Sequence, residues 1–321
     1  MNLIGNAFAR VIKGVFHFTR DDSRRPFFPM AIAEIEGRSG KVAVSTITNE
    51  QTACNALYTF CKGQLRICDI TPALISDFDQ WNKSRGISTN TRAAYLRSLR
   101  ALLNRMGIGE GCRLFENVRT SKVKVAKRAI EEEDIARVCS LQLKSNEPLS
   151  RVKALFLFCL LANGMPFIDV AFLRWEQIKN GFITYHRHKT GIKVIVPMTT
   201  KLNQIIDSWG KRKSPYVFGL LSSTHPMQAY QQYITCLRRY NTGLAKIETL
   251  AALDVHLTSY TARHTWASLA VKRGEPLAAI SKALGHTSIL TTELYLKEIG
   301  VEDLKKTTRR VAELIKINGK I

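Results

Sequence analysis

Apolar residues recur at helical spacing over most of the chain. From residue 48 to about 109 the signals are helical, and Thr71-Pro72, a capping residue before a proline at the first helical position, opens a helix that runs to about Ser84. Ser88 or Asn90 caps the next helix. Its apolar positions repeat every three or four residues, as expected of a buried face, and comprise Tyr95, Leu99, Leu102, Leu103 and Met106. This part of the chain is therefore predicted to form a small helical bundle.

The chain beyond residue 128 is also predicted to be mainly helical, with one exception. Glu131-Glu-Glu-Asp134 opens a helix, because acidic side chains in a first turn complement the helix dipole. The exception is a pair of strand-like runs, 182–188 and 192–198, which flank Lys189-Thr190-Gly191 and so predict a β-hairpin. The expected fold class is mainly α with a small β-sheet.

The length of 321 residues suggests two domains. We expect an N-terminal arm of unknown structure over 1–45, a helical domain over 46–110, a basic linker over 111–128 and a second domain over 129–321. The linker carries positive charges without amphipathic order, at Arg119, Lys122, Lys124, Lys127 and Arg128. Such a segment suits contact with the phosphate backbone of a nucleic acid.

The charge balance points the same way. The chain holds 48 Lys and Arg against 26 Asp and Glu, a formal charge of +22, and such an excess is typical of proteins that bind a polyanion. A nucleic acid and an acidic membrane surface both fit that description, and a basic enzyme with neither partner would show the same balance.

The sequence gives no indication of a membrane span, a signal peptide, disulfide bonds or a structural zinc site. The longest apolar run, 154–162, is about half of what a bilayer requires, and a signal-peptide pattern is not seen. The seven cysteines are scattered without a CxxC pair or a Cys/His cluster, which argues against disulfides and structural zinc. We therefore expect a cytoplasmic protein with no membrane partner.

Arginines occupy the remaining faces of the helix that begins near Ser88. They are Arg92, Arg97, Arg100 and Arg105. One apolar face and one arginine face suit a bundle that lies on DNA, and an ordinary solvated face explains the pattern equally well.

The familiar phosphate and metal motifs do not occur in the sequence. A Gly-rich loop that ends in Lys-Ser/Thr is not found, and carboxylates do not cluster at metal-ligand spacing. An enzyme that acts on a phosphodiester without ATP or metal needs a nucleophile, cations for the developing charge and a proton donor for the leaving oxygen. We expect no cofactor and no metal, and we look for those three groups.

Three short segments of the C-terminal half supply candidates for the nucleophile and the cationic or hydrogen-bonding groups. They are Ala262-Arg-His-Thr, Leu284-Gly-His-Thr-Ser and Thr292-Glu-Leu-Tyr. Each residue alone has an ordinary structural explanation, but the order and spacing together resemble the C-terminal signature of tyrosine recombinases, also called the phage integrase family. Residues 160–175 resemble the family's first box, and residues 48–110 its core-binding helical domain.

The resemblance implies a fold and a mechanism. A helical, SAM-like core-binding domain would precede a catalytic domain of the DNA breaking-rejoining enzyme fold. Tyr295 would attack the scissile phosphate and form a 3′-phosphotyrosine, and Arg263 would bind the non-bridging oxygens. His286 would donate a hydrogen bond to the same group, and Lys189, in the hairpin turn, would protonate the 5′ leaving oxygen. The implied partners are double-stranded DNA with specific recombination sites and a homo-tetramer on that DNA, at the bacterial nucleoid.

Two departures from the family pattern affect the site. Tyr260 stands where the family usually has a histidine, and its hydroxyl can still bind a phosphate. The first box usually carries a catalytic arginine, but its two usual positions are Pro166 and Asn163 here. Arg174 or Arg187 is a candidate to replace it in space, and Asn163 is a weaker substitute. Loss of one charge-assisted donor costs on the order of 3 kcal/mol at such a centre.

Three functions therefore stay open. The first is an active site-specific recombinase for integration, excision or inversion. The second is a DNA-binding protein on the same fold that no longer recombines, and the third is a strand-relaxing topoisomerase. Covalent attachment to DNA separates the second from the other two, since the topoisomerase shares the chemistry but not the strand exchange.

The C-terminal tail is expected to be an assembly helix. Residues 301–315 place apolar residues near one helical face, namely Val301, Leu304, Val311, Leu314 and Ile315. This face would pack on its own domain or, as the resemblance implies, on a neighbouring protomer.

Overall fold

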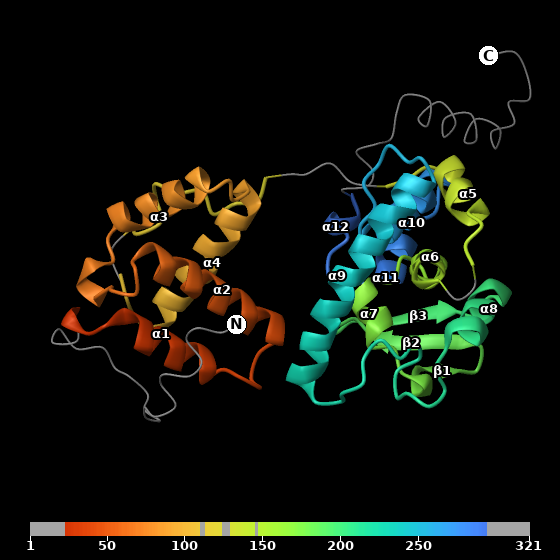
Figure 1. Ribbon diagram of the computed structural model, residues 1–321, viewed down its shortest axis with the longest axis horizontal. Coiled ribbons are helices and arrows are strands. Elements are labelled where there is room, and N and C mark those ends of the chain that lie inside the picture. Colours follow the sequence, from red (N-terminus) through yellow and green to blue (C-terminus); the bar gives the residue numbers. More distant parts are fainter. Residues whose placement is uncertain (1–22, 110–112, 124–128, 145–146, 294–321) are drawn as a thin grey trace, which may run out of the picture. The chain divides into compact units, whose positions relative to one another are not determined.

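The computed structural model describes residues 23–109, 113–123, 129–144 and 147–293. The chain divides into two compact units, residues 1–125 and 126–321. Figure 1 shows the helices of the first unit in red to yellow and the elements of the second in yellow-green to blue. Within these ranges, no helix is long and apolar enough to cross a membrane.

The first unit is a helical bundle, as the apolar spacing predicts. Its helices are α1 (Phe27–Glu36), α2 (Val44–Phe60), α3 (Pro72–Ser84) and α4 (Thr89–Arg105), with a short 3-10 helix at Ile67–Asp69. The Thr71 hydroxyl accepts a hydrogen bond from the Leu74 amide at 3.2 Å, and Ser88 caps α4 in the same way. Local capping chemistry thus sets where both helices begin.

Helix α1 lies in a segment to which the sequence assigned no structure. Pro26 precedes it, and Phe27, Ala31 and Ile35, four residues apart, are buried in the core of the unit. The first unit therefore begins before residue 46. Residues 1–22 lie outside the described part of the chain.

A buried carboxylate joins the helices of this bundle. Glu50 of α2 is buried and accepts hydrogen bonds from Arg38 and from Arg105 of α4, each at 2.8 Å. A buried charge is tolerated when it is paired on all sides. Arg105, expected on the exposed arginine face, is thus committed to a structural ion pair.

The second unit is mainly helical around one small sheet. Its helices are α5 (Glu132–Ser140), α6 (Pro148–Leu161), α7 (Phe167–Ala171), α8 (Thr200–Trp209), α9 (Pro226–Leu250), α10 (Thr261–Lys272), α11 (Leu277–Leu284) and α12 (Leu290–Glu293). Helix α6 lies at the centre and packs against α8, α9 and α10. That position explains why the 154–162 run is apolar without interruption.

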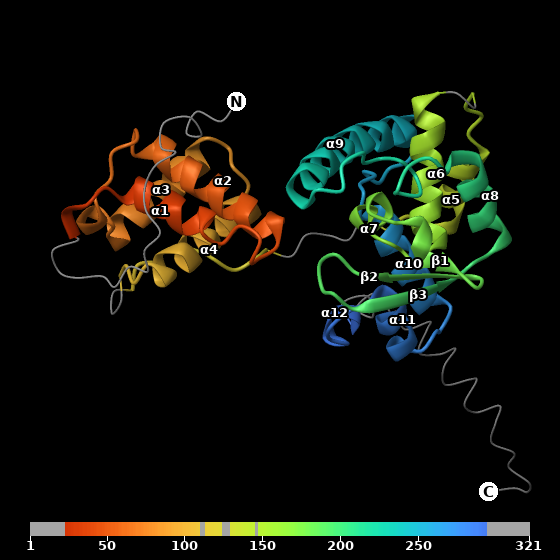
Figure 2. The same ribbon diagram turned by 90° about the horizontal axis from the view of Figure 1, so that it is seen from below.

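The sheet has three antiparallel strands in the order β1 (Ile178–Lys179), β2 (Phe182–His186) and β3 (Lys193–Pro197). The predicted hairpin is β2–β3, and β1 is an additional two-residue edge strand. Side chains alternate along β2, so that Ile183 and Tyr185 are buried. Helix α11 packs against β3, and Figure 2 shows the hairpin beside α11.

Candidate active site

Arg263 lies buried in the first turn of α10. It is only 3% exposed, and its guanidinium donates to the carbonyl oxygen of Gly164 at 3.1 Å and to that of Leu284 at 2.5 Å. These two carbonyls come from the turn after α6 and from the end of α11. The arginine of α10 is therefore held by two other segments, one of them 99 residues earlier in the chain.

The turn after α6 is shaped to admit Arg263. Gly164 has φ +65°, and a Cβ atom there would lie 2.9 Å from the Arg263 Cα atom. A side chain at this position would displace α10. The close approach of the two backbones therefore requires glycine at position 164. Asn163 also lies in the left-handed region, at φ 55°, and Pro166 is buried before α7. Neither residue supplies a cation.

A second buried arginine, Arg187, follows β2. It is 5% exposed and donates to the Gly285 carbonyl oxygen at 3.1 Å. Its Nε atom lies 3.8 Å from the Asp169 Oδ2 atom of α7. A Cβ atom at Gly285, where φ is +61°, would lie 2.7 Å from the Arg187 Cδ atom. Gly285 thus admits Arg187 as Gly164 admits Arg263.

Asp169 is a buried carboxylate beside these arginines. Its Oδ1 atom accepts the His188 backbone N–H at 2.9 Å. Burial raises the pKa of Asp169 to about 6, against the opposing effects of that hydrogen bond and of the charges of Arg187 and Arg263. The carboxylate therefore faces the hairpin and influences both guanidinium groups.

His286 follows the two carbonyls that the arginines bind. Its Nδ1 atom lies 2.8 Å from the Thr292 hydroxyl oxygen of α12. Burial is the largest cause that lowers the pKa of His286 to about 4. The remaining causes are positive charges, those of Arg263, Arg187 and Lys189. At that pKa the ring is neutral near pH 7, and a neutral imidazole can still form hydrogen bonds although it carries no charge.

The other predicted site residues differ in placement. Lys189 is exposed in the hairpin turn, near enough to His286 to affect its pKa. Tyr260 is exposed at the start of α10, one turn before Arg263. Tyr295 lies outside the described residues, two positions after the end of α12. The structure thus brings Arg263, His286 and Lys189 together.

Arg174, the other candidate for the missing arginine, lies elsewhere. Its guanidinium stands over the Tyr216 ring at 5.5 Å, and its Nη1 atom is 4.0 Å from Glu176. None of the buried site groups is among its partners in the described chain. Its surroundings are those of an ordinary half-exposed arginine.

Sequence reasoning overlooked Asp169 and Thr292. Asp169 could have been found, because a carboxylate within the apolar run Met-Pro-Phe-Ile-Asp-Val indicates a buried, paired acid. Thr292 carried no such signal, because its contact with His286 depends on how α12 packs. The cluster as a whole can hold an oxyanion with two guanidinium groups, an ammonium and a neutral imidazole.

Family matches agree with this arrangement. Residues 128–299 match the Phage integrase family, and residues 26–107 match the Phage integrase SAM-like domain. The chain belongs to the phage integrase family. The SAM-like match includes α1, so this family member's helical domain starts earlier in the chain than its apolar spacing predicted.

Relatives of this integrase-family chain are distant in sequence. A tyrosine recombinase of Pseudothermotoga lettingae is 22% identical over 56% of this chain and 59% of its own length. The tyrosine recombinase XerA of Pyrococcus furiosus is 22% identical over 74% of this chain and 79% of its own. The chain thus spans less than two thirds of the first of these relatives.

A solved structure shares the fold of the integrase-family chain. A lambda integrase tetramer bound to a Holliday junction aligns with a TM-score of 0.63 and 15% identity, over 86% of this chain and 79% of that one. At that identity the likeness concerns the fold alone.

The predicted DNA-contacting arginines of the first unit have partners within the chain. Arg92 pairs with Asp79 at 2.9 Å, Arg97 donates to the Thr120 carbonyl oxygen, and Arg100 donates to the Thr120 hydroxyl at 2.7 Å. Two of these half-buried arginines therefore fasten the linker at Thr120 to α4. Lys122 is exposed, and Lys124, Lys127 and Arg128 lie outside the described residues.

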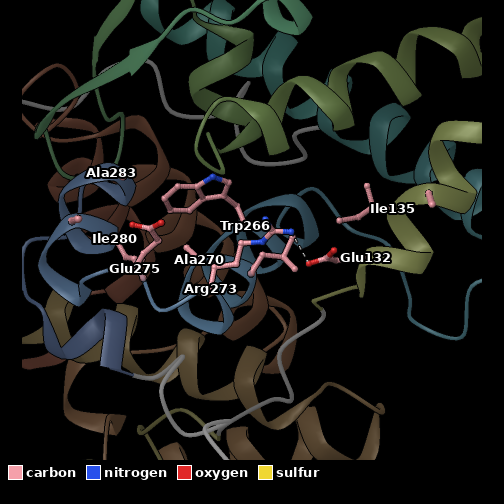
Figure 3. A pocket seen from close by; sticks show the side chains of 11 residues that line it. Glu132, Ile135, Trp266, Ala270, Arg273, Glu275, Ile280 and Ala283 are labelled. Carbon is pink, nitrogen blue, oxygen red and sulfur yellow. Dashed lines mark hydrogen bonds and ion pairs between the residues drawn. The ribbon is translucent and has the colours of Figure 1, made fainter. Parts of the chain in front are cut away.

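An apolar groove opens on the second unit of this family member. It has a volume of about 690 Å³ and lies between α5, α10 and α11. Figure 3 shows Trp266 of α10 between Ile135 of α5 and Ile280 of α11, with the Arg273–Glu132 ion pair across one side. Ala279 and Ala283 of α11 also line it.

Proposed function

We propose that the chain carries out site-specific DNA recombination by transesterification, through a 3′-phosphotyrosine formed at Tyr295. The observation that carries the proposal is the convergence of Arg263, His286 and Lys189 at the end of α11. These groups suit a pentacoordinate phosphate, and Tyr295 follows His286 by nine residues. Family membership and the charge of +22 support the same conclusion.

The chemical roles follow from the groups. The Tyr295 oxygen attacks phosphorus and passes its proton to solvent water, while the bond from phosphorus to the 5′ oxygen breaks and that oxygen gains a proton from Lys189. Arg263 stabilises the charge on the non-bridging oxygens as a planar donor. When Nδ1 of a neutral His286 accepts from the Thr292 hydroxyl, the ring proton lies on Nε2, which donates to the same oxygens. In the reverse reaction a 5′-hydroxyl attacks the phosphotyrosine and rejoins a strand. No ATP is needed, because the phosphotyrosine keeps the energy of the broken phosphodiester bond.

The DNA is proposed to be gripped by basic residues of both units. The exposed Lys122, with Lys124, Lys127 and Arg128, would follow the backbone along the linker. Arg92, Arg97 and Arg100 would present α4 and its fastened linker to the duplex, in addition to their contacts within the chain. Action on chromosomal DNA would place the protein at the bacterial nucleoid.

Assembly as a homo-tetramer on DNA is a further part of the proposal. The groove between α5, α10 and α11 is apolar and unfilled by the described chain. The apolar spacing of residues 301–315 predicts a helical face that needs such a partner. We assign the segment of one protomer to the groove of the next. Packing within one protomer is the alternative.

Charge placed in the groove tests this assignment. Ala279 lines the groove, whereas the neighbouring exposed Ala278 does not. Ala279→Arg should abolish cooperative binding to a full recombination site and leave half-site binding intact, and Ala278→Arg should do neither. Full-site cooperativity that survives Ala279→Arg, or loss of both activities together, would contradict docking between protomers.

A DNA-binding protein that no longer recombines is the second candidate. The observation that favours it is the absence of an arginine at Asn163 and Pro166. Both candidates predict salt-sensitive binding, so binding does not separate them.

Covalent capture separates them. The chain is incubated with labelled duplexes tiled across the DNA that flanks its gene, denatured, and examined for protein that carries DNA. Wild type should form adducts on one or more duplexes, and Tyr295→Phe, which lacks only the hydroxyl, should bind the same duplexes without any adduct. Binding without adducts by wild type would instead support the second candidate.

A further inference from the structure

We propose that Arg187 is a catalytic residue, the arginine that contacts the scissile phosphate in place of the one missing from the first box. The inference rests on the proposed recombination chemistry and adds a residue to it. It is carried by where β2 and α11 bring this side chain, not by any motif around it.

The phase of the strand directs Arg187 inward. Side chains alternate along β2, and Arg187 continues the buried series of Ile183 and Tyr185. His186 and His188, out of phase, are exposed. The hairpin therefore delivers a guanidinium to the inner side of the sheet, where α11 packs.

The end of α11 then fixes where that guanidinium lies. Arg263 binds the carbonyl oxygen of Leu284 and Arg187 binds that of Gly285, so the two cations occupy adjacent backbone groups immediately before His286. The pKa of His286 responds to both charges. A phosphate within reach of His286 and Arg263 is therefore close to Arg187 as well.

Arg187 keeps donor capacity that its protein contacts do not use. Its Nε atom is buried without a hydrogen-bond partner, and so is the Asp169 Oδ2 atom that faces it at 3.8 Å. The two atoms face each other without closing to hydrogen-bond distance, although an unmade buried hydrogen bond is costly. Asp169 instead serves as a positioning residue, which holds the hairpin through the His188 amide and attracts the guanidinium without saturating it.

The rival position does not offer this geometry. Arg174 is engaged with Tyr216 and Glu176 and has 42% of its side-chain surface exposed. It provides a matched control, since Arg174→Met and Arg187→Met remove the same charge and shape.

A charge-neutral substrate distinguishes a phosphate contact from a structural role. A duplex that wild type cleaves is prepared with the normal scissile phosphodiester and with a methylphosphonate there, in each of its two stereoisomers. The methyl group removes the negative charge, so a cation that stabilises this charge becomes dispensable. The release of the strand with a 5′-hydroxyl end is timed for each substrate.

Arg187→Met should slow cleavage of the phosphodiester by about 100-fold or more. On at least one methylphosphonate isomer, its rate should come within about fivefold of wild type, a margin below one charge-assisted contact. Arg174→Met should match wild type on every substrate. If Arg187→Met alone folds poorly, the paired variant Arg187→Met with Asp169→Asn takes its place, because it does not leave the Asp169 carboxylate without Arg187, and it should show the rates expected of Arg187→Met.

The opposite results overturn the inference. They are a phosphodiester rate for Arg187→Met within about threefold of wild type, or an equal loss on phosphodiester and methylphosphonate in the variant that folds. A wild-type chain that cleaves no duplex would contradict the proposed function itself, so the two failures are distinct.

Discussion

Arg263 and Arg187 donate to consecutive backbone carbonyl oxygens, those of Leu284 and Gly285, at distances of 2.5 and 3.1 Å. One arginine comes from α10 and the other from the end of β2, and they meet at the residue pair before His286. The carboxyl end of a helix carries partial negative charge, so α11 helps to hold two like charges side by side. A change at this helix end should therefore disturb both guanidinium groups.

Gly285 should be needed for the placement of Arg187. A Cβ atom there would lie 2.7 Å from the Arg187 Cδ atom and 2.6 Å from the Val194 Cγ2 atom. Gly285→Ala should lower the free energy of unfolding by about 2–4 kcal/mol, from backbone strain and overpacking together, and should slow cleavage.

Gly191 gives the matched control, because its φ is also positive, at +68°, while nothing lies within 4 Å of its added Cβ atom. Gly191→Ala should cost only the backbone strain, about 1–2 kcal/mol. Chemical denaturation measures both changes. Equal losses in the two variants would mean that crowding of Arg187 is unimportant.

The protonation of His286 should report the charge of Arg187. Its pKa is lowered to about 4 by burial and by neighbouring cations. Removal of one cation favours the protonated ring, so Arg187→Met should raise this pKa, and Arg174→Met should leave it unchanged. An NMR titration of the ring protons measures it. An unaltered pKa in Arg187→Met would place the two groups apart.

The same shift has a consequence for stability. Because the folded state binds the His286 proton more weakly than the unfolded state does, this group destabilises the fold as the pH falls from about 6.5 to about 4. His286→Gln should reduce that part of the acid sensitivity. Thermal unfolding across this pH window provides the comparison.

An arginine at position 163 should not improve the enzyme. Asn163 has φ 55°, a conformation that asparagine tolerates better than arginine does, and Arg187 already supplies the second cation. Asn163→Arg should therefore cleave no faster than Asn163→Met, which has the same backbone strain and no charge. A tenfold or greater gain from the arginine would indicate that the phosphate lacks a cation.

Features that depend on residues close together in the sequence were predicted better than features that depend on distant contacts. Thr71, Ser88 and Glu131 mark helix starts through contacts within one turn, and the 182–198 hairpin is likewise local, so these predictions are confirmed. Helix α1 was not assigned, although its apolar residues recur every four positions, and β1 is too short for alternation to reveal.

The candidate site was predictable only in part. The family signature named Arg263 and His286, which the structure brings together through Leu284 and Gly285. It could not choose between Arg174 and Arg187, because that choice depends on the packing of a hairpin against a helix almost 100 residues later. The arginine face of α4 was also ambiguous, since nothing local links Arg97 to Thr120.

The linker should contribute to the salt dependence of DNA binding. Neutralising Lys122, Lys124 and Lys127 should flatten the slope of log affinity against log salt by about 0.9 for each DNA phosphate that the variant no longer neutralises. A triple neutralisation of exposed lysines outside the linker should leave the slope nearer to that of wild type, and Lys179, Lys201 and Lys213 are suitable. Equal slopes for wild type and the linker variant would place the linker away from the DNA.

The central claim is that Tyr295 becomes joined to DNA, and mapping the covalent adduct tests it most directly. The protein–DNA adduct is digested with protease and nuclease, and the nucleotide-bearing peptide is sequenced by mass spectrometry. We predict a single modified residue, Tyr295, linked to a 3′-phosphate, with a free 5′-hydroxyl on the released strand. A nucleotide on another residue such as Tyr260, or a 5′-phosphate linkage, would contradict the account.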